Sequence, residues 1–362
     1  MKNMLRYPYV MAAVAVLIFT GCSNMGPKTV PRDRFDYNTA ISDSWKEQTL
    51  LNIVKLRYAD MPLFVEVASV VSGYTLEGSV NLGGNVSDTG GVSGDLFSLG
   101  TSGKYTDRPT ITYAPITGQK FNASFMTPIP PRLVLFLMQS GWPIDVIFPL
   151  TVDAVNGMRS QIAGGTNQRA GDADFYRVIA LLRKIQKSGA VGMKILKEEG
   201  QDDSTVLFFY RQNIAPEIAA ALDDLRQVLG LQAGAGEMKV SYGFLPATNR
   251  EIAMLTRSMM QIMIALSTQV TVPPEHVADG RTVAALSSGK DFEADLGQFI
   301  KISSSPDKPE NAYTAVKYKA HWFWVDDRDF KSKRAFAFLM ILFSLTESGG
   351  QKDLPLVTIP AG

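Results

Sequence analysis

The chain has 362 residues, of which 46% are hydrophobic, so it can form one elaborated domain or two modest ones. Its 36 basic and 35 acidic residues give a net charge of +1, which excludes the basic footprint of a nucleic-acid-binding protein. Because Cys22 is the only cysteine, an internal disulfide and a cysteine-based zinc or iron–sulfur site are excluded as well.

The first 21 residues have the features of a cleaved signal peptide. Lys2 and Arg6 supply positive charge, an apolar run extends from Val10 to Phe19, and small residues precede Cys22. This run is about half of the ~20 residues that cross a bilayer as a helix, so a permanent transmembrane anchor is the weaker interpretation. An ordinary secretory signal with a chance cysteine is the other alternative.

The segment FTGCS resembles a bacterial lipobox, with Phe19 in place of the usual leucine. This resemblance implies lipidation of Cys22 and, because Ser23 rather than aspartate follows, sorting to the outer membrane of a Gram-negative cell. Residues 22–34 contain Pro and Gly and few apolar groups, and we expect them to form the lipid anchor and a short tether. The body is then expected to stay near the bilayer and to face the periplasm.

Residues 37–58 are expected to form a helix, because their apolar side chains recur at helical spacing. Residues 70–115 have period 2 instead, on both sides of a glycine-rich tip. This pattern predicts a long β-hairpin with one apolar face. The residues predicted for that face are Tyr74, Leu76, Val80, Leu82, Tyr105, Ile111 and Tyr113.

Two interpretations of this hairpin remain open. It can belong to a soluble sheet with one face on the core. Alternatively, each copy can contribute its hairpin to a shared oligomeric barrel, since each arm exceeds the ~9–11 residues of a tilted transmembrane strand. Pro109, which cannot donate a hydrogen bond, and the neighbouring charges of Asp107 and Arg108 favour the soluble sheet.

The rest of the chain alternates between helical and strand patterns. We expect helices at about 132–139, 172–188, 216–229 and 249–267, strands at 191–196, 204–211, 237–244 and 313–325, and a buried helix containing 335–343. Glu251 is placed to cap the helix that starts near residue 249. The predicted fold class is therefore α+β. The N-terminal helix and the long β-hairpin make up residues 35–128, and a mixed helix and antiparallel-sheet domain follows in 129–362.

Recognisable catalytic motifs are lacking. The two histidines, His276 and His321, stand neither in an HExxH motif nor beside the cysteine, and no GxSxG nucleophile motif occurs. A histidine-rich metal site is not expected from this spacing. The sequence therefore predicts no catalytic residue, no cofactor and no enzymatic activity.

Two further groups near the C-terminus have a structural and a functional interpretation. Asp326, Asp327 and Asp329 are weak candidates for a metal site, because carboxylates bind hard cations, but aspartates also cap the start of a helix. Trp322 and Trp324 could stack on sugars, but they are expected to lie on the core face of the strand at 313–325.

Three segments are similar to blocks found in uncharacterised Gram-negative lipoproteins: LLNIVKLRYADMPLFVEV, TPIPPRLVLFLMQSGWP and HWFWVDDRDFKSKRAFAFLMILFSLTESGG. This resemblance implies no activity or substrate. The sequence predicts a non-enzymatic protein, anchored to the outer membrane by lipid, that binds a protein partner or further copies of itself. The alternatives are an oligomeric pore or export component built from residues 70–115, and a hydrolase of cell-wall or surface polymers.

Overall fold

The computed structural model describes residues 29–71, 73–85, 96–161, 171–196, 204–209, 214–283 and 299–346. These residues divide into two compact units. Leu63–Asn122 form a hairpin unit, and the segments up to Pro62 and from Ala123 onward form an α+β body. The α+β class is confirmed. The predicted division differs at both boundaries, since the N-terminal helix and residues 123–128 belong to the body and not to the hairpin.

A six-stranded sheet is the largest sheet of the α+β body. Its strand order is β6-β5-β10-β9-β8-β7, and all neighbours are antiparallel except β9 and β10, which are parallel. The strands are β5 (Val152–Val155), β6 (Met158–Arg159), β7 (Val191–Leu196), β8 (Ser204–Phe209), β9 (Glu237–Tyr242) and β10 (Glu251–Thr256).

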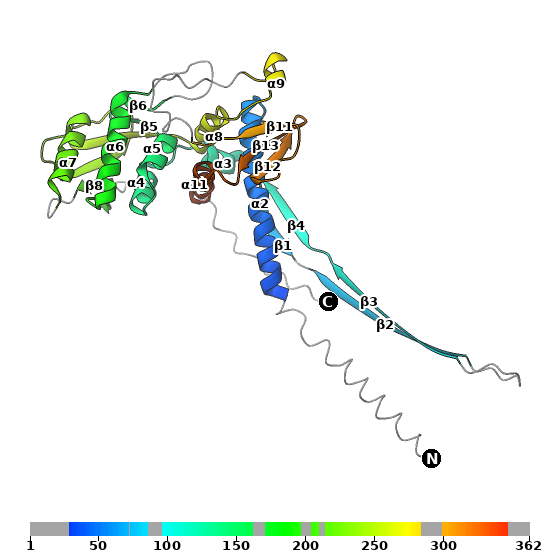
Figure 1. Ribbon diagram of the computed structural model, residues 1–362. Coiled ribbons are helices and arrows are strands. Elements are labelled where there is room, and N and C mark those ends of the chain that lie inside the picture. Colours follow the sequence, from blue (N-terminus) through cyan, green and yellow to red (C-terminus); the bar gives the residue numbers. More distant parts are fainter. Residues whose placement is uncertain are drawn as a thin grey trace, which may run out of the picture. The chain divides into compact units, whose positions relative to one another are not determined.

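Four helices contribute apolar side chains to one face of this sheet, and α6 and α7 lie side by side (Figure 1). On β9, Met238 and Val240 are buried while Glu237 and Lys239 are exposed. This alternation is typical of a sheet with one face on a core and one in solvent. The helices are α4 (Pro131–Gln139), α5 (Ile144–Thr151), α6 (Ala173–Ser188) and α7 (Pro216–Val228).

A second core forms around the long helix α2 (Thr29–Arg57), which packs on β12 (Ala312–Tyr318) and on α8 (Met259–Ser267). Leu50, Ile53 and Phe323 are fully buried there. The remaining elements of the body are β11 (Ser303–Ser305) and β13 (His321–Asp326), which with β12 form an antiparallel sheet of order β11-β13-β12, and the helices α9 (Pro274–Ala278) and α11 (Phe330–Thr346).

The predicted N-terminal helix is confirmed, but it begins earlier than the sequence pattern indicates. Residues 29–34, predicted as part of the tether, are helical. Pro31 is tolerated there because a proline in the first helical turn removes no intrahelical hydrogen bond. Cys22 and the rest of the tether lie outside the described residues. Within the described part of the chain, no helix combines the length and apolar content that crossing a membrane requires.

The predicted helix at 249–267 is wrong in its first half. Residues 251–256 form the strand β10, and α8 starts after Ser258, whose side chain forms a capping box with Gln261. The run from Ile252 to Met254 is buried throughout. A short, uniformly apolar run does not distinguish a central strand from a buried helix by its periodicity.

Glu251 accordingly caps no helix. Its carboxylate accepts hydrogen bonds from the Ser241 hydroxyl and from the backbone N–H of Ala247, the latter at 2.9 Å. The Ser241 hydrogen bond is the main cause that lowers the pKa of Glu251.

Because the folded state prefers ionised Glu251, the stability that this carboxylate contributes is present above the ordinary glutamate pKa of ~4.3 and is lost as the pH falls below it. We expect Glu251→Gln to weaken this dependence and to cost about 1 kcal/mol at pH 7. Urea unfolding at pH 7 and at pH 3.5 measures both effects. Equal losses of stability on acidification in the two proteins would contradict the prediction.

The single strand predicted at 313–325 is also wrong, because the chain folds back at Lys319 and Ala320. These two residues have φ values of 45° and 70° and join β12 to β13, with Tyr318 paired to His321. The turn was missed because neither residue is the Gly or Asn that usually marks it. The fold-back also changes the core face: Phe323 and Val325 are fully buried, whereas Trp322 and Trp324 lie half-buried on the other face.

A non-glycine residue at positive φ is strained, at a cost of roughly 1–2 kcal/mol. We therefore expect Ala320→Gly to raise the free energy of unfolding by about 0.5–1 kcal/mol, after the greater flexibility of glycine in the unfolded chain is subtracted. The exposed Ala247, which lacks a positive φ, provides the matched control, and Ala247→Gly should not stabilise. Urea unfolding of both variants checks this, and destabilisation by Ala320→Gly would refute it.

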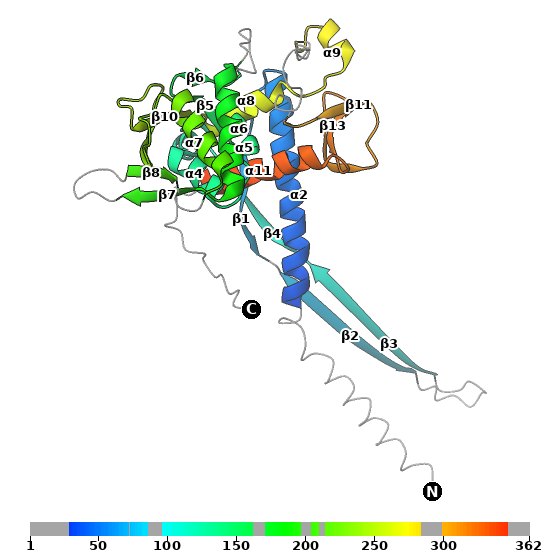
Figure 2. The same ribbon diagram turned by 60° about the vertical axis from the view of Figure 1, so that its left-hand side comes forward.

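In the hairpin unit, β1 (Val65–Val71) pairs with β4 (Thr110–Pro115), and β2 (Tyr74–Asn85) pairs with β3 (Leu96–Asp107). Figure 2 shows the long β2–β3 ladder. The predicted hairpin is confirmed. Pro109 lies where the two ladders are interrupted, and the Arg108 N–H donates to the Gly73 carbonyl at 2.9 Å beside it. The short helices α3 (Gly118–Phe121) and η1 (Asn122–Met126) follow.

Candidate functional site

The ladder of β2 and β3, called the ribbon below, contains five of the seven residues predicted for the apolar face. The register pairs Leu76 with Tyr105 and Leu82 with Leu99, so these positions alternate with the polar ones along both strands. Of the intervening residues, Glu77, Ser79 and Lys104 are exposed. The other two predicted residues, Ile111 and Tyr113, lie on β4 and are 40% and 61% exposed.

Within the described part of the chain, β2 and β3 form a sheet of two strands, and neither pairs with a third strand. The described residues therefore do not support the prediction that the hairpin joins a larger soluble sheet. A two-stranded hairpin is at best marginally stable in water, and a long unpaired edge is a template for another strand. Each strand has 12 residues, well above the average strand.

Charges of opposite sign stand at the same level of the two edges. Glu77 on β2 is the register partner of Lys104 on β3, and both side chains are exposed. Next to them, the hydroxyls of Ser79 and Ser102 are 2.6 Å apart. If the β3 edge of one copy met the β2 edge of the next in the same register, Lys104 would stand beside Glu77 again.

The three aspartates predicted as weak metal candidates do not converge. The Asp329 carboxylate accepts hydrogen bonds from the Ser332 backbone N–H at 3.1 Å and from the Ser332 hydroxyl at 2.6 Å, near the start of α11. Asp326 accepts from the backbone N–H of Arg328, and Asp327 forms an ion pair with Lys333 at 2.6 Å. These contacts favour the helix-capping interpretation.

The two histidines, in contrast, meet at a site that the sequence did not indicate. His276 on α9 and His321 on β13 have ring centroids 4.9 Å apart with nearly perpendicular planes. Glu275 Oε1 lies 3.0 Å from His321 Nε2, and one coordinating atom from each of the three residues lies within 4.8 Å of the other two. We call Glu275, His276 and His321 the histidine cluster.

Tyr58, just after α2, closes this cluster from the core side. Its hydroxyl is 2.6 Å from Nδ1 of His276, which is only 1% exposed, and the direction of this hydrogen bond depends on the tautomer of the ring. Burial lowers the pKa of His276, with a smaller contribution from the positive charge of Arg281. Burial also raises the pKa of Tyr58 to about 12, so a protonated phenol meets a neutral imidazole at pH 7.

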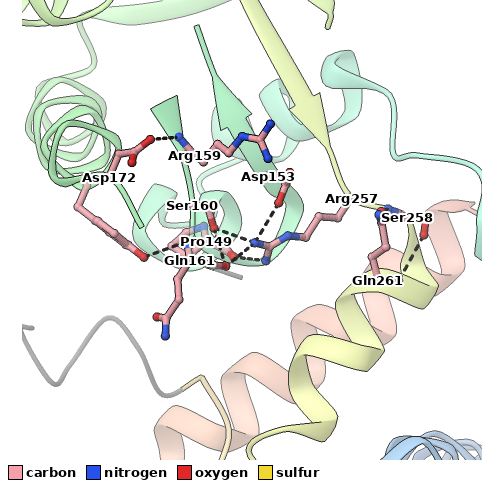
Figure 3. Close-up of polar contacts among 10 residues, drawn as sticks. Pro149, Asp153, Arg159, Ser160, Gln161, Asp172, Arg257, Ser258 and Gln261 are labelled. Carbon is pink, nitrogen blue, oxygen red and sulfur yellow. Dashed lines mark hydrogen bonds and ion pairs between the residues drawn. The ribbon is translucent and has the colours of Figure 1, made fainter. Parts of the chain in front are cut away.

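A third polar group is the buried network around Arg257, shown in Figure 3. The guanidinium donates to the Pro149 carbonyl at 2.9 Å, to the Ser160 hydroxyl at 2.8 Å and to the Gln161 carbonyl at 3.0 Å, with the Asp153 carboxylate 3.6 Å away. Burial lowers the pKa of Arg257. Its partners are oxygen atoms of α5, β5 and the segment after β6. We therefore interpret this network as one that stabilises the packing of these segments and not as a ligand-binding site.

Comparison of the chain with protein-family models, with curated proteins and with solved structures found no match. Function is therefore inferred from the geometry of the ribbon and of the histidine cluster.

Proposed function

We propose that this protein is a lipid-anchored component of the Gram-negative outer membrane that acts by assembly with further copies of itself and not by catalysis. The observation that supports this proposal most directly is the ribbon, whose two 12-residue strands form a sheet with each other and with no further strand of the described residues. The position of Glu77 and Lys104 at the same level of opposite edges favours a second copy as the partner. Lipidation of Cys22 is part of the proposal, and it would concentrate the copies on one surface.

Head-to-tail association of this kind repeats from copy to copy, and it closes into a ring when the rotation between neighbouring copies allows it. A second candidate function is therefore a pore or export component. The strand length favours it, since 12 residues exceed the 9–11 that a tilted strand needs to cross a bilayer. An adaptor, meaning an assembly that stays outside the bilayer, would use the same edges without entering the membrane.

The deciding experiment is the mass and particle size of the mature protein extracted from membranes in mild detergent. We expect the mass of a chain that starts at a lipidated Cys22, and particles larger than one copy. Ring-shaped particles that conduct ions in planar bilayers would select the pore over the adaptor. A monodisperse monomer in detergent and in lipid nanodiscs would refute the assembly proposal.

A further inference from the structure

The histidine cluster has the donor set of a transition-metal site. Imidazole nitrogen suits zinc, copper, nickel and iron, and a carboxylate is a frequent third ligand beside two histidines. A tetrahedral zinc ion with ligand distances of about 2.0–2.1 Å separates its ligand atoms by about 3.4 Å. Glu275 Oε1 and His321 Nε2 are already 3.0 Å apart, and the widest separation in the cluster is within 4.8 Å. Movements on the order of 1 Å therefore bring all three atoms onto one ion.

The Nδ1 atoms of the two histidines have different surroundings. Among the described residues, His321 Nδ1 is buried without a hydrogen-bond partner, although the side chain as a whole is 14% exposed. His276 has the opposite arrangement: its Nδ1 is held by the Tyr58 hydroxyl at 2.6 Å. Metal-binding histidines are usually oriented through the second ring nitrogen in this way, which would leave Nε2 of His276 to coordinate.

The neighbouring cations have carboxylate partners of their own. Arg281 is paired with Asp279 at 2.7 Å, and Lys319 is 3.5 Å from Asp60. Glu275 contributes a carboxylate that is 56% exposed, so an ion can enter from solvent on that side. The cluster thus combines a buried, oriented imidazole with an accessible acidic ligand.

We propose that Glu275, His276 and His321 bind one borderline divalent transition-metal ion, with Zn²⁺ as the reference ion. Two nitrogens and one oxygen leave a fourth position for water or an external ligand. The ion would tie the short helix α9 to the start of β13, which otherwise meet through these side chains. This site is independent of the ribbon and of the assembly proposed above.

The test uses the detergent-extracted mature chain, without a histidine tag, titrated with Zn²⁺ and with Co²⁺. We expect one equivalent of Zn²⁺ to bind and to raise the melting temperature, and we expect Co²⁺ to give the visible absorption of a four-coordinate nitrogen–oxygen site. Glu275→Gln should weaken binding by at least about tenfold, and His321→Gln should abolish it. Tyr58→Phe should weaken it by about tenfold, because it removes only the group that orients His276.

Glu217→Gln, an exposed substitution on α7, is the matched control and should bind like the wild type. Glu275 is half-exposed, so its variant reports on binding even if a histidine variant fails to fold. Saturable binding with unchanged affinity in Glu275→Gln and His321→Gln would overturn the assignment. So would the absence of one-to-one binding in the wild type.

Discussion

Arg257→Ala is expected to lower the free energy of unfolding by about 3–5 kcal/mol. The substitution removes the guanidinium donor from the buried Pro149 carbonyl and Ser160 hydroxyl and from the part-buried Gln161 carbonyl, and it removes the counter-charge of Asp153. Each unsatisfied group retains its desolvation penalty, which explains why the loss exceeds the net value of the hydrogen bonds.

Arg257→Lys should recover part of this loss, because an ammonium keeps the charge but does not reproduce the fork of the guanidinium. Arg250→Ala is the control: that guanidinium donates to Gln232 at an exposed site, and its removal should cost less than about 1 kcal/mol. Urea unfolding followed by tryptophan fluorescence measures all three variants. A loss for Arg257→Ala no larger than that for Arg250→Ala would contradict this stabilising role.

Excision of residues 74–107 should abolish assembly and leave the α+β body folded. The Arg108 N–H donates to the Gly73 carbonyl at 2.9 Å, which is the hydrogen bond that closes a two-residue hairpin turn. An Asn-Gly pair inserted between Gly73 and Arg108 can therefore replace the whole ribbon without straining β1 and β4. We expect the free energy of unfolding of the body, measured in urea, to differ from that of the full chain by less than about 1 kcal/mol. We expect the detergent-extracted particles to have the mass of one copy.

A charge exchange provides the matched control for the excision. Glu77→Lys places like charges across every ribbon contact and should weaken assembly, whereas Glu77→Lys combined with Lys104→Glu should restore it. Light scattering coupled to size-exclusion chromatography gives the particle mass of each variant. Excised protein that keeps the particle size of the full chain would show that the ribbon is not the assembly element.

Elements with a strong local period were predictable from the sequence. The helix α6 has apolar residues at 3.6 spacing and ends at Gly189, whose φ of 71° suits a helix C-cap, and its predicted bounds differ from the observed ones by one residue. The ribbon was predicted equally well, because alternation over 12 residues is incompatible with a helix. Both features depend on neighbours in sequence alone.

The predictions that were wrong depend on distant partners. The run from Ile252 to Met254 in strand β10 is buried at every position, and nothing local distinguishes it from a helix. The meeting of His276 and His321 depends on how α9 packs beside β13, and no motif spacing connects two single histidines from separate elements. A site of this kind can be identified from the folded structure but not from the sequence.

The packing of α2 has a consequence for the order of folding. This helix finds its partners in α8 and β12, so residues 29–57 complete their contacts only when residues 259–267 and 312–318 are available. Contacts so distant in sequence make folding slow, because long loops must close first. The apolar side of α2 is therefore exposed during synthesis until late in the chain. Chains truncated before β12 should be bound by chaperones or degraded.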